Sequence, residues 1–185
     1  MTEHAQLVQL LATRSARRGQ FTLASGRQST LYIDARLTTM SPEGLVVIGA
    51  LGLATIRESW KVDAVGGLTL GADPISYAIS YASAATDQPL RAFTVRKEAK
   101  SHGTGKLIEG PFKAGDRTVV IDDVITTGGS ALKAVAAVQE AGGRVVGVLA
   151  LVDREEGGRE AIEAAGVSVV SLVTARELLP MIALT

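Results

Sequence analysis

The stretch that decides the fold is RTVVIDDVITTGGSALKAV, residues 117–135. An apolar, β-branched run ends in two carboxylates, Asp122 and Asp123, and a short Thr-Thr-Gly-Gly-Ser loop leads directly into a segment of helical periodicity. Alternation of strand and helix builds parallel α/β sheets, in which ligands bind beyond the carboxyl ends of the strands. The loop after Asp123 therefore occupies a position where a ligand is expected.

The composition of this loop favours a phosphate. Gly128 and Gly129 allow a tight turn and a close approach of the backbone. Thr126, Thr127 and Ser130 add hydroxyl donors, and the start of the following helix offers free N–H groups at its positive end. The two carboxylates must face something else, such as sugar hydroxyls, a metal-bound water or a developing cation. A phosphate beside a diol suggests a phosphorylated ribose.

A plainer interpretation is that the Asp pair caps the helix and the glycines are structural. Two adjacent charges at the end of a buried strand are costly unless they are used, so the functional interpretation is preferred. A P-loop requires Gly-Lys-Ser/Thr, but Ser130 follows Gly129 here, and no GxGxxG follows the strand. Kinase-like and NAD-binding functions are therefore disfavoured.

The rest of the chain repeats the alternation of strand and helix. The middle strands are continuous apolar runs, typical of a sheet covered by helices on both faces. We therefore expect one α/β domain over residues 1–185, with a central parallel sheet flanked by helices and a small N-terminal appendage. Helices are predicted at 3–18, 42–60, 73–85, 129–141, 159–165 and 174–179, and strands at 62–68, 91–97, 117–124, 144–153 and 167–173, with two short strands within 21–36.

The composition excludes several classes of protein. Nineteen Lys and Arg balance nineteen Asp and Glu, which argues against a nucleic-acid binder held by global charge. There is no cysteine, and the two histidines, His4 and His102, lie far apart, so Cys-based and His-rich metal sites are disfavoured. No apolar run approaches the ~18 residues of a membrane span. The start is amphipathic and does not resemble a signal peptide, so a cytoplasmic protein without membrane contact is expected.

The segment VVIDDVITTGGSA (119–131) resembles the phosphoribosyl-diphosphate (PRPP) motif of the type I phosphoribosyltransferases. FTLASGRQSTLYIDAR (21–36), VRKEAKSHGTGKLIEG (95–110) and VDREEGG (152–158) resemble the orotate phosphoribosyltransferase family in particular. GGLTLGADP (66–74) also stands in the expected place, so the resemblance covers nearly the whole chain in the right order.

This resemblance implies a fold, a reaction and an assembly. The fold is that of the type I phosphoribosyltransferases, with residues 1–40 forming a hood that contributes to the base site. The reaction transfers phosphoribosyl from PRPP to N1 of orotate, giving orotidine 5′-monophosphate and pyrophosphate in pyrimidine (UMP) biosynthesis. Mg²⁺ is carried mainly by the substrate, without a dedicated protein site. The assembly is a homodimer in which Lys100 and His102 reach into the neighbouring subunit's site.

The stretch 95–110 concentrates positive charge, with Arg96, Lys97, Lys100, His102 and Lys106 within eleven residues. A solvated loop is the plainer interpretation, but a closing cationic lid is what a departing pyrophosphate requires, because cations placed where charge develops lower the barrier. The resemblance implies catalytic roles for Lys100, His102, Asp122 and Asp123, with Lys100 the most rate-critical. The PRPP-binding residues that it implies are Arg96, Lys97, Lys100, His102, Asp122, Asp123, Val124, Ile125, Thr126, Thr127, Gly128, Gly129 and Ser130.

Arg154 is the expected partner of the orotate carboxylate, because a guanidinium binds a carboxylate bidentately and uracil lacks that group. A surface ion pair with Asp153 is the alternative. By resemblance, Tyr32 and Ile33 stack on the pyrimidine and Thr126 lies near it, although Tyr32 could be a plain core residue. Some family members carry Tyr-Lys where this chain has Leu70-Gly71, so main-chain N–H groups of residues 69–72 are predicted to bind the diphosphate.

Three alternative functions remain open. Another type I phosphoribosyltransferase would use the same chemistry on a different base, and the 95–110 loop and Arg154 disfavour it. A nucleotide-binding regulator with this fold would be expected to carry a basic patch or an added DNA-binding segment. A binding module without catalysis would leave the cationic loop unexplained.

Overall fold

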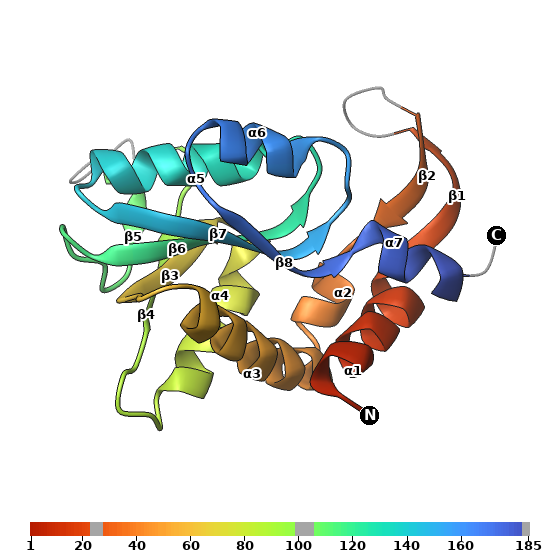
Figure 1. Ribbon diagram of the computed structural model, residues 1–185, viewed down its shortest axis with the longest axis horizontal. Helices are drawn as coiled ribbons and strands as arrows, with labels where there is room; N and C mark the ends of the chain where they lie inside the picture. Colours follow the sequence, from red (N-terminus) through yellow and green to blue (C-terminus); the bar gives the residue numbers. More distant parts are fainter. Residues whose placement is uncertain (23–27, 99–105, 183–185) are drawn as a thin grey trace.

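The centre of the protein is a six-stranded sheet with the strand order β5-β4-β3-β6-β7-β8 (Figure 1). The computed structural model describes residues 1–22, 28–98 and 106–182. All neighbouring strands are parallel except the edge pair β4 and β5, which is antiparallel. The strands are β3 (Ala64–Leu68), β4 (Arg91–Val95), β5 (Ile108–Glu109), β6 (Arg117–Ile125), β7 (Arg144–Asp153) and β8 (Val169–Thr174).

Helices cover both faces of the sheet. Figure 1 shows α3 (Pro42–Ser59) and α4 (Ala72–Ser83) below it, and α5 (Gly129–Glu140) and α6 (Gly158–Ala164) above it. The helix α3 begins as its sequence predicts, because the Ser41 hydroxyl accepts a hydrogen bond from the Gly44 N–H at 3.1 Å. No helix in the described parts of the chain is both long and apolar enough to cross a membrane.

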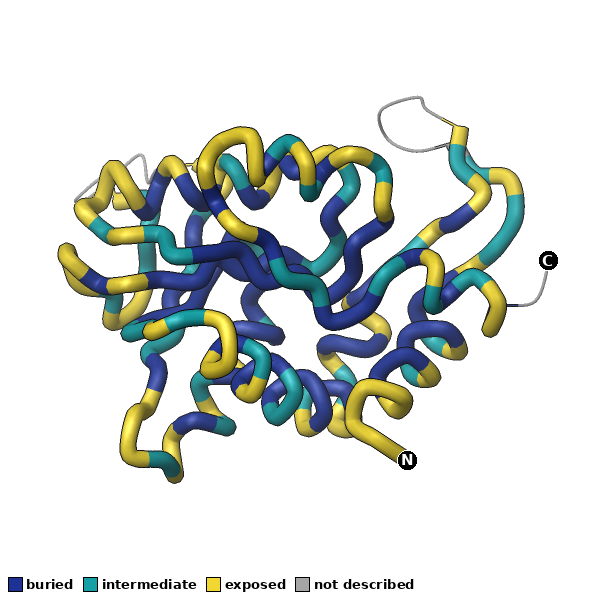
Figure 2. The backbone as a smooth tube through the Cα atoms, viewed as in Figure 1, coloured by how far each residue is buried: buried dark blue, intermediate teal, exposed yellow. Residues whose placement is uncertain are grey.

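The hydrophobic core forms two layers separated by the sheet, and the buried segments follow the strands (Figure 2). Side chains of β6 alternate between them: Val119 and Ile121 pack with α3 and α4, whereas Val120 packs with α5. A strand buried on both sides explains why the sequence of β6 is continuously apolar until Asp122.

An N-terminal unit packs against one end of the sheet. It contains α1 (Glu3–Leu10), a π-helical turn (Leu11–Ser15) and the antiparallel strands β1 (Ala16–Thr22) and β2 (Gln28–Ile33). The short helix α2 (Arg36–Thr39) follows. From the C-terminal part of the chain, α7 (Ala175–Leu178) and the 3₁₀ turn Leu179–Met181 lie beside this unit (Figure 1). Leu7, Leu11 and Leu31 belong to the same core cluster as Leu149 and Leu178, so this unit shares its core with the sheet.

Three local predictions were wrong. The helix predicted over 3–18 ends at Ser15, because residues from Ala16 onward pair with β2 in the register Ala16↔Ile33. Residues 34–36 leave the predicted strand and lead into α2. The polar stretch after Glu98 contains the two-residue strand β5, which makes the sheet mixed, not purely parallel. In the first and third cases a pairing between strands overrides the local pattern, whereas residues 34–36 turn into α2 through local bonds such as that from the Leu37 N–H to the Asp34 carbonyl.

Candidate active site

A cavity of about 320 Å³ opens at the carboxyl ends of β3 and β6. One wall comes from β2 and the turn into α2, another from the connection between β3 and α4, and the floor from the end of β6. The topology therefore places a cavity where parallel sheets bind ligands. Its lining residues are Tyr32, Ile33, Asp34, Ala35, Arg36, Leu68, Thr69, Leu70, Gly71, Lys97, Asp122, Asp123, Val124 and Ser130.

Asp122 and Asp123 lie in this cavity with perturbed acidities. Asp122 is only 7% exposed, and its burial, together with the charge of Asp123, raises its pKa to about 7. The N–H of Ala131 in the first turn of α5 favours the charged form but does not outweigh the burial. Burial also raises the pKa of Asp123, while the nearby Arg36 guanidinium acts in the opposite direction. The free site is therefore less negative at neutral pH than two ordinary carboxylates would make it.

The loop from Thr126 to Ser130 connects the Asp pair to α5. Gly128 has a left-handed backbone with φ of 80°, and a Cβ there would lie 2.8 Å from the carbonyl oxygen of Gly158. A Cβ on Gly158 would in turn lie 2.6 Å from the carbonyl oxygen of Thr126. The loop is thus pressed against the start of α6, and glycine is required on both sides of this contact. Ile125 is fully buried, so only its main chain can face a ligand.

The connection between β3 and α4 forms the opposite wall. Its Thr69–Leu70 peptide bond is cis. The Thr69 hydroxyl donates to Asp73 Oδ2 at 2.7 Å, and the Thr94 hydroxyl on β4 donates to Asp73 Oδ1 at 2.8 Å. A Cβ on Gly71 would overlap the carboxylate of Asp123. This wall therefore meets the Asp pair with main chain alone at residue 71.

Two cations line the cavity, Arg36 and Lys97. Arg36 holds Asp34 with two side-chain bonds, Nε to Oδ1 at 2.8 Å and Nη2 to Oδ2 at 3.0 Å. These bonds lower the pKa of the Asp34 carboxyl. Sequence reasoning assigned Tyr32 and Ile33 in this segment but missed Asp34 and Arg36, as it missed the buried acceptor Asp73 on the far wall. The available signal was an Asp-x-Arg pair directly after a strand.

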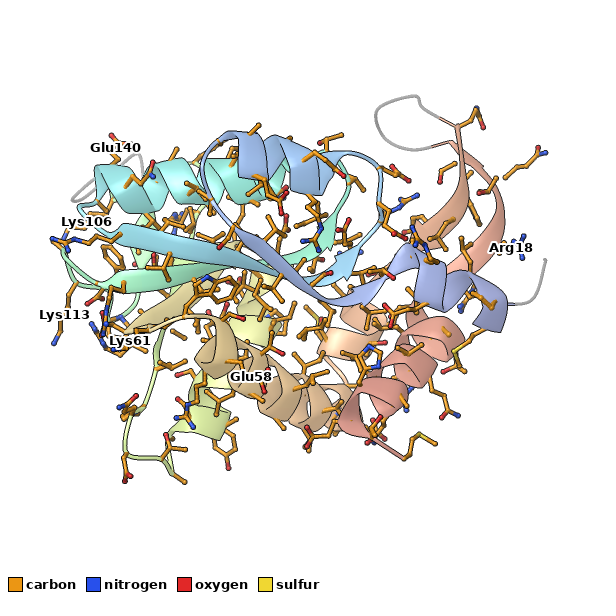
Figure 3. All side chains as sticks on the ribbon, viewed as in Figure 1. Arg18, Glu58, Lys61, Lys106, Lys113 and Glu140 are labelled. Atoms are coloured by element: carbon orange, nitrogen blue, oxygen red, sulfur yellow. The ribbon has the colours of Figure 1, made fainter. Side chains whose placement is uncertain are left out.

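The predicted cationic patch 96–106 is divided in the structure. Lys97 lines the cavity, whereas the Arg96 guanidinium lies 3.4 Å from Glu109 on β5. Lys106 lies in a different depression with Glu140 of α5, and Figure 3 shows it at the same end of the molecule as Lys113. The predicted residues Lys100 and His102 lie outside the described residues. Of the patch, the described structure brings only Lys97 to the Asp pair.

Arg154 joins the end of β7 to the N-terminal unit. Its guanidinium Nη2 donates to the Ser29 hydroxyl at 2.7 Å and to the Leu31 carbonyl at 2.8 Å, and lies 2.7 Å from Glu156 Oε1. Its Nε is buried and has no hydrogen-bond partner within the described residues. The alternative of a surface pair with Asp153 is wrong, because Asp153 is held by Arg159 Nε at 2.8 Å and the Arg154 side chain is only 5% exposed.

The strand β2, which Arg154 holds, presents Tyr32 and Ile33 to the cavity. The Tyr32 side chain is 43% exposed and contacts Phe21 with ring centroids 5.6 Å apart, so it is not a core residue. Thr126 and Arg154 are not among the residues that line the cavity. No group of three or more potential metal ligands occurs within the described residues.

The cavity has the chemistry expected for a phosphorylated sugar, and the match to a family model shows that the chain is a phosphoribosyltransferase. The profile of the phosphoribosyl transferase domain family matches residues 43–173. An adenine phosphoribosyltransferase from Leishmania donovani, at 20% identity and a TM-score of 0.68, shares the fold alone.

Several relatives of higher identity are orotate phosphoribosyltransferases. The chain is 47% identical over 182 residues to orotate phosphoribosyltransferase of Aquifex aeolicus, covering 97% of this chain and 99% of the relative. A crystal structure of Mycobacterium tuberculosis H37Rv orotate phosphoribosyltransferase in complex with PRPP has a TM-score of 0.80 and 42% identity, covering 96% of this chain and 99% of that chain. The same enzyme in complex with Fe(III) dicitrate has a TM-score of 0.84 and 44% identity, with coverages of 96% and 99%. The chain belongs to the orotate phosphoribosyltransferase family.

Proposed function

We propose that this protein transfers the phosphoribosyl group of PRPP to N1 of orotate, releasing pyrophosphate and orotidine 5′-monophosphate in pyrimidine biosynthesis. The observation that carries the proposal is the cavity in which the Asp122–Asp123 pair meets both the β3–α4 connection and the strand β2. The name shared by relatives of 47% and 48% identity over nearly the whole chain supports orotate as the base. The PRPP bound to the tuberculosis enzyme supports the donor.

The loop after β6 binds the 5′-phosphate in this proposal. Its five residues, Thr126 to Ser130, combine hydroxyl donors with the N–H groups of the first turn of α5. Asp122 and Asp123 accept hydrogen bonds from the ribose hydroxyls, and Val124 and Ile125 contribute main-chain groups. Ionisation of the Asp pair then balances the positive charge that develops at the anomeric carbon as the diphosphate departs.

The diphosphate lies toward Lys97 and the main chain of residues 69–72. Arg96, Lys100 and His102 complete the cationic set, and His102 donates a proton to the leaving group, since its ordinary pKa is about 6.5. Closure of the segment that carries Lys100 and His102 excludes water, which would otherwise hydrolyse the activated ribose.

The residues present fit a Mg²⁺ ion that arrives with the substrate. This ion usually binds through one or two carboxylates together with substrate phosphates. Asp122 and Asp123 supply carboxylates at the cavity, and the described residues contain no larger ligand cluster. When bound, the ion neutralises charge on the diphosphate and makes it a better leaving group.

Orotate lies between the sheet and the strand β2, where Tyr32 and Ile33 contact the ring and Thr126 lies beside it. Arg154 binds the carboxylate of the base. Its buried Nε without a partner supports this role, because a carboxylate oxygen of the base at Nε would satisfy that donor.

A homodimer with shared loops completes the proposal. Large apolar side chains stand exposed on α2, α3 and α4 and on the residues next to α2 and α4, and α3 packs against both α2 and α4. Two of them, Tyr77 and Tyr81, lie one turn apart on α4 and are 51% and 85% exposed. Exposed apolar groups gathered on adjoining helices favour a protein interface. The side chains are Leu37, Met40, Val46, Leu70, Tyr77 and Tyr81.

We also propose that residues 1–185 act as one domain, with residues 1–40 as a hood over the base site. The core shared by Leu7, Leu31 and Leu149 supports this, as does the bond from Arg154 to Leu31.

The first experiment offers purified protein PRPP and Mg²⁺ with orotate, uracil, adenine or hypoxanthine, and follows the ultraviolet absorbance of each base. We expect turnover of orotate alone. Turnover of another base without turnover of orotate would contradict the proposal and would favour a different phosphoribosyltransferase.

The variant Arg154→Ala should raise the KM for orotate at least tenfold and leave the KM for PRPP within about twofold, because a charge-assisted hydrogen bond contributes roughly 1.5–3 kcal/mol. Arg176→Ala is a control that removes a surface arginine away from the proposed base site, since Arg176 is 84% exposed and pairs with Glu155. Thermal unfolding of both variants separates a loss of binding from a loss of fold, and Arg154→Lys retains the charge without the fork. An unchanged KM for orotate in folded Arg154→Ala would refute the assignment.

A further inference from the structure

Arg36 is a cation of the cavity to which the reaction described above gives no role. It belongs to the four-residue helix α2, and its side chain is 52% exposed. It lines the cavity together with Asp123, Leu70 and Gly71. It also lines a neighbouring depression with Leu70, so it stands at the edge of the wall formed by the β3–α4 connection.

The contacts of Arg36 leave half of its guanidinium available. Asp34 occupies Nε and one hydrogen of Nη2, and the Arg36 main-chain N–H bonds the same carboxylate at 3.2 Å. A guanidinium carries five N–H donors in a planar fork. Within the described residues no partner of Nη1 is found, so the Nη1–Nη2 edge remains open. Asp34 therefore orients the Arg36 guanidinium and leaves some of its N–H donors for a ligand.

The charge of the cavity indicates that binding a diphosphate requires Arg36 as a cation. Its lining includes three carboxylates, Asp34, Asp122 and Asp123, but only two cations within the described residues, Arg36 and Lys97. A diphosphate carries several negative charges and requires cations close to its oxygens. The wall at residue 71 cannot supply one, because any side chain there would overlap the carboxylate of Asp123. A cation for this wall comes from another element, and Arg36 of α2 lines the cavity together with Leu70 and Gly71.

We propose that Arg36 binds the diphosphate of PRPP with its Nη1–Nη2 edge, while Asp34 positions it through the opposite edge. This rests on the proposed function, since it assumes that PRPP occupies the cavity. The diphosphate is favoured over the 5′-phosphate because the Thr126–Ser130 loop already offers hydroxyls and helix N–H groups to the latter.

The test compares Arg36→Ala with Arg117→Ala. Arg117 pairs with Asp63 in the same geometry, through Nε at 2.9 Å, Nη2 at 2.8 Å and its main-chain N–H at 2.9 Å. It is 44% exposed and stands at the start of β6, the end opposite to the Asp pair. The two substitutions therefore remove equivalent surface ion pairs, and only one of them lines the cavity.

Binding is measured by calorimetry with PRPP, inorganic pyrophosphate and ribose 5-phosphate as separate probes, each with Mg²⁺, and thermal unfolding is recorded in parallel. For Arg36→Ala we expect the Kd of PRPP and of pyrophosphate to rise at least tenfold, with the Kd of ribose 5-phosphate within twofold. Arg36→Lys should be intermediate, because it keeps the charge and loses the fork. Arg117→Ala should have the same three Kd values as the unsubstituted protein.

Pyrophosphate affinity within twofold in folded Arg36→Ala would overturn the inference. Loss of ribose 5-phosphate affinity with retained pyrophosphate affinity would reassign Arg36 to the 5′-phosphate and would overturn it equally. If the unsubstituted protein bound neither PRPP nor pyrophosphate, the proposed function itself would fail, which is a separate result. If Arg36→Ala does not fold, Arg36→Lys and Asp34→Asn carry the same comparison.

Discussion

At Asp122, the burial that the fold imposes disfavours the ionised carboxylate that the proposed reaction uses. A ligand site at the end of β6 requires a carboxylate there, yet the strand is buried on both faces up to that residue. Burial and the adjacent Asp123 raise the pKa of Asp122 from 3.8 to about 7. The folded protein thus holds a proton on Asp122 over a pH range in which the unfolded chain does not, and folding stability must depend on pH through this group.

The variant Asp122→Asn tests this dependence. The stabilising effect of the raised pKa is complete below pH 4 and is lost as the pH rises through 7, because ionising the buried group in the folded state is unfavourable. The variant removes the ionisation. Its unfolding free energy should therefore equal that of the unsubstituted protein near pH 4 and exceed it at pH 8. A shift of about 3 pH units sets an upper limit of about 4 kcal/mol on the gain. Urea denaturation at pH 4, 6 and 8 measures it.

Asp63→Asn is the control with the opposite sign. The hydrogen bonds from Arg117 lower the pKa of Asp63 to about 2, so that carboxylate stabilises the fold above pH 4 and loses its effect as the pH falls toward 2. Its substitution should destabilise the protein at pH 8. If the unfolding free energies of Asp122→Asn and the unsubstituted protein differ by the same amount at pH 4 and at pH 8, the burial argument is contradicted.

At the scale of elements, the connection between β3 and α4 depends on one buried acceptor. Asp73, 8% exposed in the first turn of α4, receives the hydroxyls of Thr69 and Thr94 and so ties the connection to β4. The Thr94 hydroxyl also lies 2.8 Å from the Tyr77 hydroxyl. The main chain that meets the diphosphate in our proposal is therefore held from behind by side chains that do not touch the substrate.

Asp73→Ala should raise the KM for PRPP about tenfold and leave the KM for orotate within about twofold, because the connection loses its anchor while β2 and Arg154 are untouched. Unfolding free energy should fall by about 1–3 kcal/mol, since two hydroxyls lose their acceptor. Ser83→Ala is the control: Ser83 is also buried, its hydroxyl accepts from the Leu90 N–H at 2.8 Å, and it lies at the far end of α4. Equal changes in the KM for both substrates would mean that Asp73 has a purely structural role. Asp73→Asn keeps an acceptor and should recover part of the PRPP affinity.

At the scale of the whole molecule, the proposed dimer predicts that two inactive proteins can restore activity together. In the proposal, Lys100 acts in the neighbouring subunit's site, whereas Asp122 acts in its own. Mixing Lys100→Ala with Asp122→Ala after unfolding and refolding should give heterodimers with one intact site. Random pairing returns about a quarter of the unsubstituted activity.

Lys100→Ala mixed with His102→Ala is the control, because both changes fall in the same loop and no pairing creates an intact site. Activity restored in neither mixture would mean that the loop serves its own subunit. Size-exclusion chromatography with light scattering reports the dimer independently. Tyr81→Glu, which places a charge on the exposed apolar face of α4, should weaken the dimer if that face is the interface.

Much of the fold could be predicted from local pattern. The segment β6–loop–α5 was predicted to within one residue at each boundary, because a buried strand, a glycine turn and an amphipathic helix each act over a few neighbouring residues. The strand β5 was missed because two residues carry no periodicity, and their pairing with β4 exists only in three dimensions. The helix predicted over 3–18 was too long because β2, which takes up Ala16, comes later in the chain.

By itself, the sequence determined the Asp122–Asp123 pair, the Thr126–Ser130 loop and the resemblance that links them to PRPP, since these groups are contiguous and their geometry follows from the local backbone. Only the tertiary structure decided which distant groups join them. Arg154 and its partner Ser29 are 125 residues apart, and Arg36 reaches the wall of Gly71 from a different element. Such contacts depend on how helices and strands pack over the sheet, and no local pattern in the chain encodes that packing.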